Sequence, residues 1–192
     1  MALALPAAAA ERLAAWGRGV VRGLPGRARA LPADTLHMTL VFIGERPARE
    51  VDTIAAACSI ASAWPRISLS PGEPVWLPPR RPRVLAIELS DPAGALCALQ
   101  AALAARLAAA GVISDAGRPF RPHVSVARTR GTAPRRPARR PPADAASESR
   151  AATVPAPALE PFEADAVALL RSLPGAGGPR YLPLATFALT GP

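Results

Sequence analysis

The sequence predicts a single α+β domain, and three observations support that prediction. The chain has 192 residues, half of them apolar, which is enough for one sizeable core. Apolar residues recur at helical spacing in some segments and alternate as in strands in others. The resulting order is βαβαββαβ, then a linker, then ββ, and such strands can pair in either direction.

The N-terminal half alternates the two kinds of element. Residues 1–6 (MALALP) read as a short strand, and Leu13, Trp16 and Val20 lie at helical spacing in a helix from Ala7 to about Arg22. The elements expected next are turn material at 24–35, a strand at 36–44 ended by Gly44, an Ala-rich helix at 49–63, a short strand at 66–70 and a Pro-rich loop at 71–82.

The C-terminal half continues with a strand at 83–90. Asp91 or Ser90 is expected to cap a helix that runs to about Ala110 and stops at Gly111. The last predicted elements are strands at 120–128, 165–172 and 180–189, with a turn at 173–179.

Residues 131–157 differ in composition from the rest of the chain. They include six prolines and five arginines, and Val154 is their one aliphatic residue larger than Ala. Such a segment cannot bury enough surface to fold, so it is predicted to be a disordered insertion within one domain spanning 1–192.

The charge and cysteine content restrict the function classes. The net charge is +9, with arginine as the basic residue throughout, and favours an anionic partner such as phosphate or nucleic acid. Cys58 and Cys97 are far apart in sequence and are expected to be reduced, buried thiols of a cytoplasmic protein rather than zinc ligands. The N-terminus lacks a basic region and no apolar run reaches 18 residues, so neither a signal peptide nor a membrane span is predicted.

The two histidines of the chain both open the same pattern. His37 begins HMTL and His123 begins HVSV: histidine, apolar, hydroxyl, apolar. Thr and Ser total 18 of the 192 residues (8 and 10). A hydroxyl two positions after both histidines would therefore arise by chance in roughly 1% of cases, which disfavours a coincidental pair of core strands.

Strand geometry places each histidine beside its hydroxyl residue. Residues i and i+2 of a strand face the same side, so His37 projects with Thr39, and His123 with Ser125. Met38, Leu40 and Phe42 are then expected to face a core on the opposite side, as are Val124 and Val126. If the two strands lie side by side, both pairs line one cleft.

Such a cleft suits phosphodiester chemistry. A neutral imidazole can take a proton from water and an imidazolium can protonate the departing oxygen, because the ordinary pKa of histidine permits both states near neutral pH. The two hydroxyls can donate hydrogen bonds to the non-bridging phosphoryl oxygens. No metal or other cofactor is needed, and no ligand cluster for a metal is evident.

The chain resembles the 2H phosphoesterase superfamily, and within it the RNA 2′,3′-cyclic phosphodiesterases, also called 2′-5′ RNA ligases. The resemblance extends from LHMTLVFIG and FRPHVSVAR to stretches around 83–89 and 167–189, in the expected order. It implies a bilobal fold of two pseudo-symmetric α+β units around a central cleft. It also implies that His123 is the base, that His37 is the acid and that the product is a 2′-phosphate.

The resemblance assigns phosphate binding to Thr39 and Ser125, where Ser125 replaces the family's usual Thr but keeps the hydroxyl. Arg128 ends the second motif and is expected either to contact phosphate or to hold a loop through a carboxylate, whereas Arg121 is expected to lie on the surface. Four aromatic residues could stack on bases, although a core position is expected for each: Phe42, Trp76, Phe120 and Tyr181.

Three functions remain open from the sequence. The first is a monomeric enzyme that hydrolyses a 2′,3′-cyclic phosphate at an RNA end. The second is 2′-5′ ligation or cleavage on tRNA or another cyclic phosphate, which would use the same two histidines. The third is a non-catalytic RNA-binding module, which the intact pairs of histidine and hydroxyl disfavour because a binder needs no paired acid and base.

Overall fold

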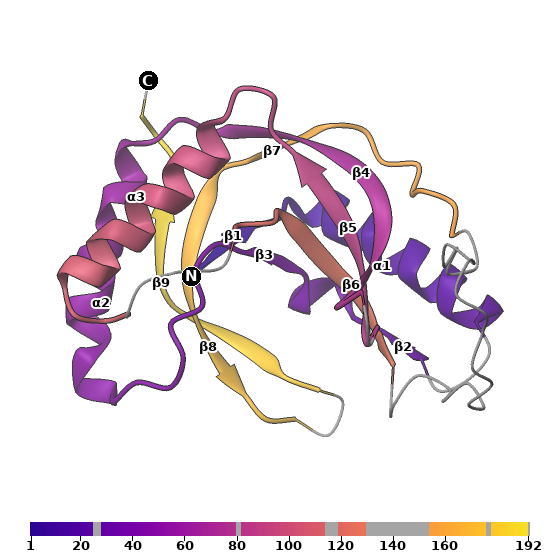
Figure 1. The fold of residues 1–192 in the computed structure, drawn as a ribbon, viewed down its shortest axis with the longest axis horizontal. Helices are drawn as coiled ribbons and strands as arrows, with labels where there is room; N and C mark the ends of the chain where they lie inside the picture. The colour runs from indigo at the N-terminus through magenta and orange to yellow at the C-terminus, as the bar shows by residue number, and fades with distance from the viewer. Residues whose placement is uncertain (25–27, 80–81, 114–118, 130–153, 176–177, 192) are drawn as a thin grey trace, which may run out of the picture.

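The protein folds around one curled antiparallel sheet with few helices (Figure 1). The computed structural model describes residues 1–24, 28–79, 82–113, 119–129, 154–175 and 178–191. Its strands are β1 (Ala2–Ala4), β2 (Ala28–Ala30), β3 (His37–Thr39), β4 (Ile67–Leu77), β5 (Val84–Ser90), β6 (His123–Thr129), β7 (Phe162–Ala164), β8 (Ala166–Leu173) and β9 (Arg180–Ala188). The α+β class predicted from sequence is confirmed.

The strand order brings together segments that are far apart in the chain. The sheet runs β7-β4-β5-β6-β3-β1-β8-β9, and β2 pairs with the far part of β6. The two strands that carry the histidine motifs, β3 and β6, are therefore direct neighbours at the centre of the sheet.

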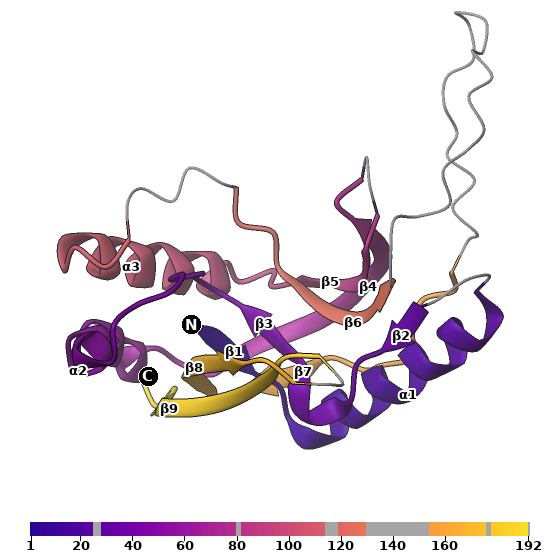
Figure 2. The same cartoon turned by 90° about the horizontal axis from the view of Figure 1, so that it is seen from below.

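The helices lie at the two ends of this sheet. They are α1 (Ala7–Gly23), α2 (Val51–Cys58) and α3 (Ala95–Ala109), with 3-10 turns η1 (Ala33–Thr35), η2 (Ala48–Glu50) and η3 (Ser59–Ala63). Figures 1 and 2 show α2 and α3 together at one end of the molecule and α1 at the other. None of the helices in the described ranges is both long and apolar enough to cross a membrane.

The chain repeats one arrangement on each side of the β6/β3 pair. On one side β1 leads through α1 and back to β3, which pairs with β1 so that Ala4 lies opposite His37. On the other side β5 leads through α3 and back to β6, which pairs with β5 so that Glu88 lies opposite His123. Each histidine thus opens the return strand of a strand–helix–strand unit.

Helix α1 packs closely on β6 through its small residues. Ala10, Leu13, Ala14 and Gly17 are buried at spacings of three and four, as expected for one helix face. A Cβ at Gly17 would lie 3.1 Å from the Val126 carbonyl oxygen, so the absent side chain lets α1 approach the motif strand. This packing supports β6 from behind.

Helix α3 starts later than expected. Asp91 accepts hydrogen bonds from the backbone N–H groups of Ala93 and Leu96 at 3.1 and 2.6 Å, so it does cap the first turn, but the helix begins only at Ala95. Gly111, with φ of 67°, follows the helix as predicted. Cys97 is exposed rather than buried, because it lies one position from the buried leucine face of α3.

Two predicted elements are shorter or interrupted. The strand at 36–44 ends at Thr39 instead of Gly44, because the backbone N–H groups of Leu40 and Val41 both donate to the Met1 carbonyl, at 2.9 and 3.2 Å. The helix at 49–63 is α-helical only over α2 and continues as η3.

The segment predicted as a Pro-rich loop is largely strand. β4 runs to Leu77 and pairs with β5 along this stretch, with a register shift between Pro71 and Pro74. Proline has no backbone N–H, so it is tolerated at such irregularities and at a strand edge where no neighbouring strand would accept that N–H. The short strands β2 and β7 were not expected, since the sequence suggested a turn at 24–35 and no element between the linker and the strand at 165–172.

Most of the predicted insertion at 131–157 lies outside the described residues. Its last residues, 154–157, are described, and the Pro155 carbonyl accepts a hydrogen bond of 3.1 Å from the Trp16 indole on α1.

Candidate active site

The two motifs meet with crossed partners. β3 and β6 are antiparallel, with Met38 opposite Val124. That register places His37 across from Ser125 and Thr39 across from His123, all on one face of the sheet. Met38 and Val124 are fully buried on the other face, as the alternation predicted. Each histidine therefore neighbours both its own hydroxyl residue and that of the other motif.

The residues predicted to form the site line one cavity. It has a volume of about 230 Å³. Its lining includes all five residues singled out from the sequence: His37, Thr39, His123, Ser125 and Arg128. The remaining lining residues are Leu31, Thr35, Ser172 and Pro179, which the sequence did not point to, and Phe42 and Tyr181, for which a core position was expected. The cleft of paired histidines and hydroxyls is thus present in the structure.

Both imidazole rings are held in the same tautomer. Nδ1 of His37 lies 2.9 Å from the Thr35 carbonyl oxygen, and Nδ1 of His123 lies 2.7 Å from the Arg121 carbonyl oxygen. A carbonyl can only accept, so Nδ1 carries a proton in both rings. Nε2 is consequently the atom left on each histidine to take up or give a proton.

The surroundings of His37 favour its neutral form in the free protein. Burial lowers the pKa of His37 below the ordinary value of 6.5, the hydrogen bond to Thr35 opposes that effect, and the N-terminal ammonium and Arg128 lower the pKa further. A bound anion would act in the opposite direction, because negative charge stabilises imidazolium. The state of His37 is therefore expected to depend on what occupies the cavity.

The dependence of the His37 pKa on a bound anion gives a direct prediction. Adding inorganic phosphate should raise the pKa of His37, so that the imidazolium persists to higher pH in the bound than in the free protein. An NMR titration of the imidazole signals measures this, and a chain with two histidines makes assignment simple. An unchanged or lowered pKa would mean that the anion does not lie against His37.

Arg128 supplies positive charge at the cavity. It lines the cavity and is close enough to influence the pKa of His37. The ion pairs among the described residues are Arg46–Glu50, Arg66–Glu163 and Arg121–Glu88, so none of them engages Arg128. Of the two roles left open for Arg128, an ion pair that would hold a neighbouring loop is not seen among the described residues.

Arg121 lies on the surface, as expected. Its Nε is 2.6 Å from Oε1 of Glu88, the residue opposite His123 in the sheet. Because the Arg121 carbonyl accepts the Nδ1 proton of His123, this ion pair flanks the group that orients His123.

The prediction that Phe42 faces the core is wrong. Its side chain is 86% exposed and lines the cavity. Leu40 and Val41 are both buried and both bond to the Met1 carbonyl, so one extra residue is inserted as in a β-bulge and the alternation shifts by one position. Phe42 therefore emerges on the side of the histidines.

Of the other three aromatic residues, two lie in the core as expected and one does not. Trp76 and Phe120 pack against the core, as expected. Tyr181 does not: it lines the cavity, and its ring meets that of His37 edge to face, with centroids 4.4 Å apart and an interplanar angle of 74°. The sequence does not predict this contact, because β9 and β3 are separated in the sheet by β8 and β1 and approach each other only where the sheet curls.

Comparison with known proteins places this chain in one family. The family model for the 2′-5′ RNA ligase superfamily matches residues 5–176. The chain therefore belongs to the 2′-5′ RNA ligase superfamily, which confirms the resemblance found in the sequence. No relative among functionally curated proteins matches it.

Solved structures agree over nearly the whole chain. The protein TT0787 of Thermus thermophilus is 25% identical with a TM-score of 0.76, covering 99% of this chain and 96% of its own. Escherichia coli LigT is 27% identical, with coverage of 98% and 95%; the TM-score is 0.73 for the apo form and 0.72 for the complex with 3′-AMP. A protein described as a phosphoesterase matches at 25% identity, covering 98% of this chain and 96% of its own, with a TM-score of 0.70. The fold is therefore that of LigT-like phosphoesterases.

Proposed function

We propose that the protein is an RNA 2′,3′-cyclic phosphodiesterase that opens a terminal cyclic phosphate to a 2′-phosphate. The observation that carries the proposal is the crossed arrangement of His37, Ser125, Thr39 and His123 around one cavity. Two imidazoles with free Nε2 atoms and two hydroxyls are the groups that hydrolysis of a phosphodiester needs.

The proposed step uses one histidine on each side of phosphorus. His123 takes a proton from water as the water oxygen bonds to phosphorus. The bond from phosphorus to the 3′ oxygen breaks, and His37 gives its proton to that oxygen. The bond to the 2′ oxygen survives, so a 2′-phosphate results. Each proton transfer contributes about 10²–10⁴-fold in rate.

Charge on the phosphoryl oxygens is balanced by the remaining residues. Thr39 and Ser125 can each donate a hydroxyl hydrogen bond to a non-bridging oxygen, and Arg128 adds a positive charge at the same cavity. The bound anion also favours protonation of His37, which the role of acid requires. Substrate binding therefore prepares the acid.

Two further observations support a nucleotide end as the substrate. LigT, similar to this chain, has been crystallised with 3′-AMP and with phosphate. The exposed ring of Phe42 beside the histidines offers a surface on which a base can stack, and base stacking on an aromatic side chain contributes about 1–3 kcal/mol. The net charge of +9 suits a polyanionic substrate such as RNA.

Phe42→Ala should weaken nucleotide binding without harming the chemistry. We expect KM for a 2′,3′-cyclic nucleotide to rise by about fivefold or more, with kcat little changed, because only the stacking surface is lost. On a p-nitrophenyl phosphodiester that carries no base, kcat/KM should stay near that of the unmodified protein. Leu184→Ala, an exposed residue of β9 outside the cavity, is the matched control. Equal losses on both substrates would mean that Phe42 does not bind the base.

The experiment that tests the proposed function is turnover without metal. Purified protein in EDTA should open the cyclic phosphate of a 2′,3′-cyclic nucleotide and of a short RNA ending in that group, because His37 and His123 supply both proton transfers. Among the described residues, no group of three or more His, Cys, Asp or Glu side chains is placed to hold a metal ion. Activity that disappears in EDTA and returns with a divalent ion would overturn the mechanism.

A further inference from the structure

Tyr181 contacts His37 from a distant part of the chain. The two rings are 4.4 Å apart between centroids and nearly perpendicular, an arrangement that aromatic pairs prefer. Tyr181 lies on β9, at the edge of the sheet, whereas His37 lies on β3 near the centre. The contact exists because the sheet curls so that β9 faces the cavity.

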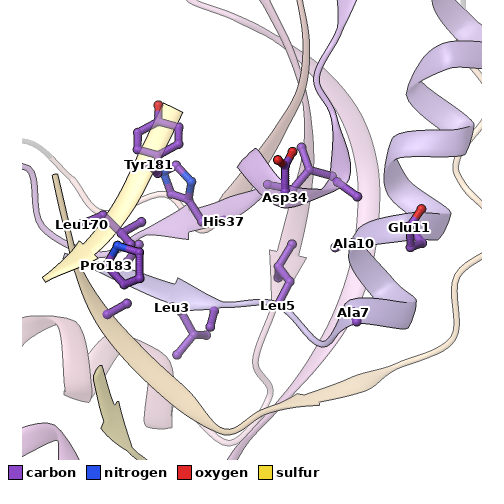
Figure 3. A pocket seen from close by; sticks show the side chains of 15 residues that line it. Leu3, Leu5, Ala7, Ala10, Glu11, Asp34, His37, Leu170, Tyr181 and Pro183 are labelled. Carbon is purple, nitrogen blue, oxygen red and sulfur yellow. The ribbon is translucent and has the colours of Figure 1, made fainter. Parts of the chain in front are cut away.

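A second cavity also borders His37 (Figure 3). It has a volume of about 390 Å³, and Ala2, Ala4 and Ala168 contribute only methyl groups to its lining. His37 and Tyr181 are the two residues that line both cavities. Together they form the wall between them.

This geometry gives the imidazole room to move away from the phosphate. The hydrogen bond from Nδ1 to the Thr35 carbonyl holds one edge of the ring. The neighbour opposite His37 on β1 is Ala4, which is too small to contain the ring on that side. The Tyr181 ring contacts the imidazole, and in Figure 3 it stands directly beside it.

We propose that Tyr181 is a positioning residue for His37, whose ring keeps the imidazole out of the second cavity and directs Nε2 toward the leaving oxygen. The inference rests on the proposed function, because it assigns Tyr181 to the acid of that reaction. His123 is held differently, through the hydrogen bond from its Nδ1 to the Arg121 backbone carbonyl. Changes at Tyr181 should therefore affect the acid and spare the base.

The test compares Tyr181→Leu, which removes the aromatic ring, with Tyr181→Phe, which keeps it. A displacement of about 1 Å at a reacting group can cost 10²-fold, so Tyr181→Leu should lose about 10- to 100-fold in kcat on a 2′,3′-cyclic nucleotide. The loss should be much smaller on a p-nitrophenyl phosphodiester, whose leaving group departs without a proton. Tyr181→Phe should remain near the unmodified protein on both substrates, as should Leu182→Ala, the exposed neighbour on β9.

A double variant separates positioning from a general structural role. If Tyr181 acts through His37, then Tyr181→Leu combined with His37→Ala should lose no more activity than His37→Ala alone. Losses that multiply, equal losses on both substrates, or a Tyr181→Phe variant as impaired as Tyr181→Leu would each overturn the inference.

NMR tests the inference separately from the proposed function. In Tyr181→Leu the imidazole signals of His37 should broaden by exchange, beyond the shift caused by losing the neighbouring ring current, because the imidazole samples both cavities, while those of His123 stay sharp. Sharp His37 signals with no exchange broadening would overturn the inference even if cyclic phosphates are hydrolysed. The broadened signals in a protein that does not hydrolyse cyclic phosphates would support the positioning contact and reject the proposed function.

Discussion

His37→Ala is expected to lose about 10²–10⁴-fold in kcat on a 2′,3′-cyclic nucleotide and far less on a p-nitrophenyl phosphodiester. The leaving group of a cyclic nucleotide is an alkoxide, which needs a proton, and His37 is the proposed donor. A p-nitrophenolate leaves as a stable anion and needs no acid. Steady-state rates of the two substrates, measured with the same protein preparation, give the comparison.

The ratio of the two losses identifies the acid. His37 is half-buried beside Tyr181, so its removal could also disturb the cavity. A disturbed cavity would lower the rates on both substrates alike, and circular dichroism of the variant checks that the fold is intact. A folded His37→Ala protein equally impaired on both substrates would mean that His37 is not the acid.

His123→Ala should be impaired on both substrates by about 10²–10⁴-fold. Whatever group leaves, water must still lose a proton as it attacks, and His123 is the proposed base. The matched control is Arg121→Gln. It removes the charged partner of Glu88 but keeps the backbone carbonyl that accepts the Nδ1 proton of His123. Its effect should be small, because exposed ion pairs contribute little.

Recovery of the His123→Ala rate on the activated ester alone would reverse the acid and base assignments. If His123→Ala regained its rate on the activated ester while His37→Ala did not, His123 would be the acid and His37 the base. The lowered pKa of His37 in the free protein makes this comparison informative, because a neutral imidazole is also the form that a base requires.

The central part of the site could be predicted from sequence because strand periodicity is a local property. Two positions along a strand return to the same face, so His37 with Thr39 and His123 with Ser125 follow from the pattern alone. That the two strands pair, and that each histidine lies across from the hydroxyl of the other motif, depends on sheet order. Periodicity carries no information about sheet order, and the resemblance to a known family implied a shared central cleft but no strand order.

Phe42 shows where periodicity stops being informative. Its predicted core position assumed that the strand continues to Gly44, but the strand ends at Thr39, where two successive N–H groups turn to the Met1 carbonyl. Register depends on such long-range contacts, and a shift of one residue moves every later side chain to the other face. A residue expected in the core thus lies exposed at the cavity.

The prediction of a loop for the Pro-rich stretch after Ser70 was wrong for a related reason. Proline opposes a strand only where its missing N–H would have to pair with a neighbour. Over this part of β4 the pairing is with β5 on one side, and β7 pairs only with Ile67–Leu69. Whether a strand edge is free is a property of the whole sheet, so the local sequence favoured a loop instead.

The measurement that tests the central claim most directly is the identity of the product formed from 2′,3′-cyclic AMP. Phosphorus NMR distinguishes the 2′- from the 3′-phosphate, and a protein carrying both His37→Ala and His123→Ala serves as the control for contaminating enzymes. We expect the unmodified protein to form the 2′-phosphate alone and the doubly substituted protein to form none. A 3′-phosphate product, no turnover by the unmodified protein, or equal turnover by both proteins would contradict the central claim.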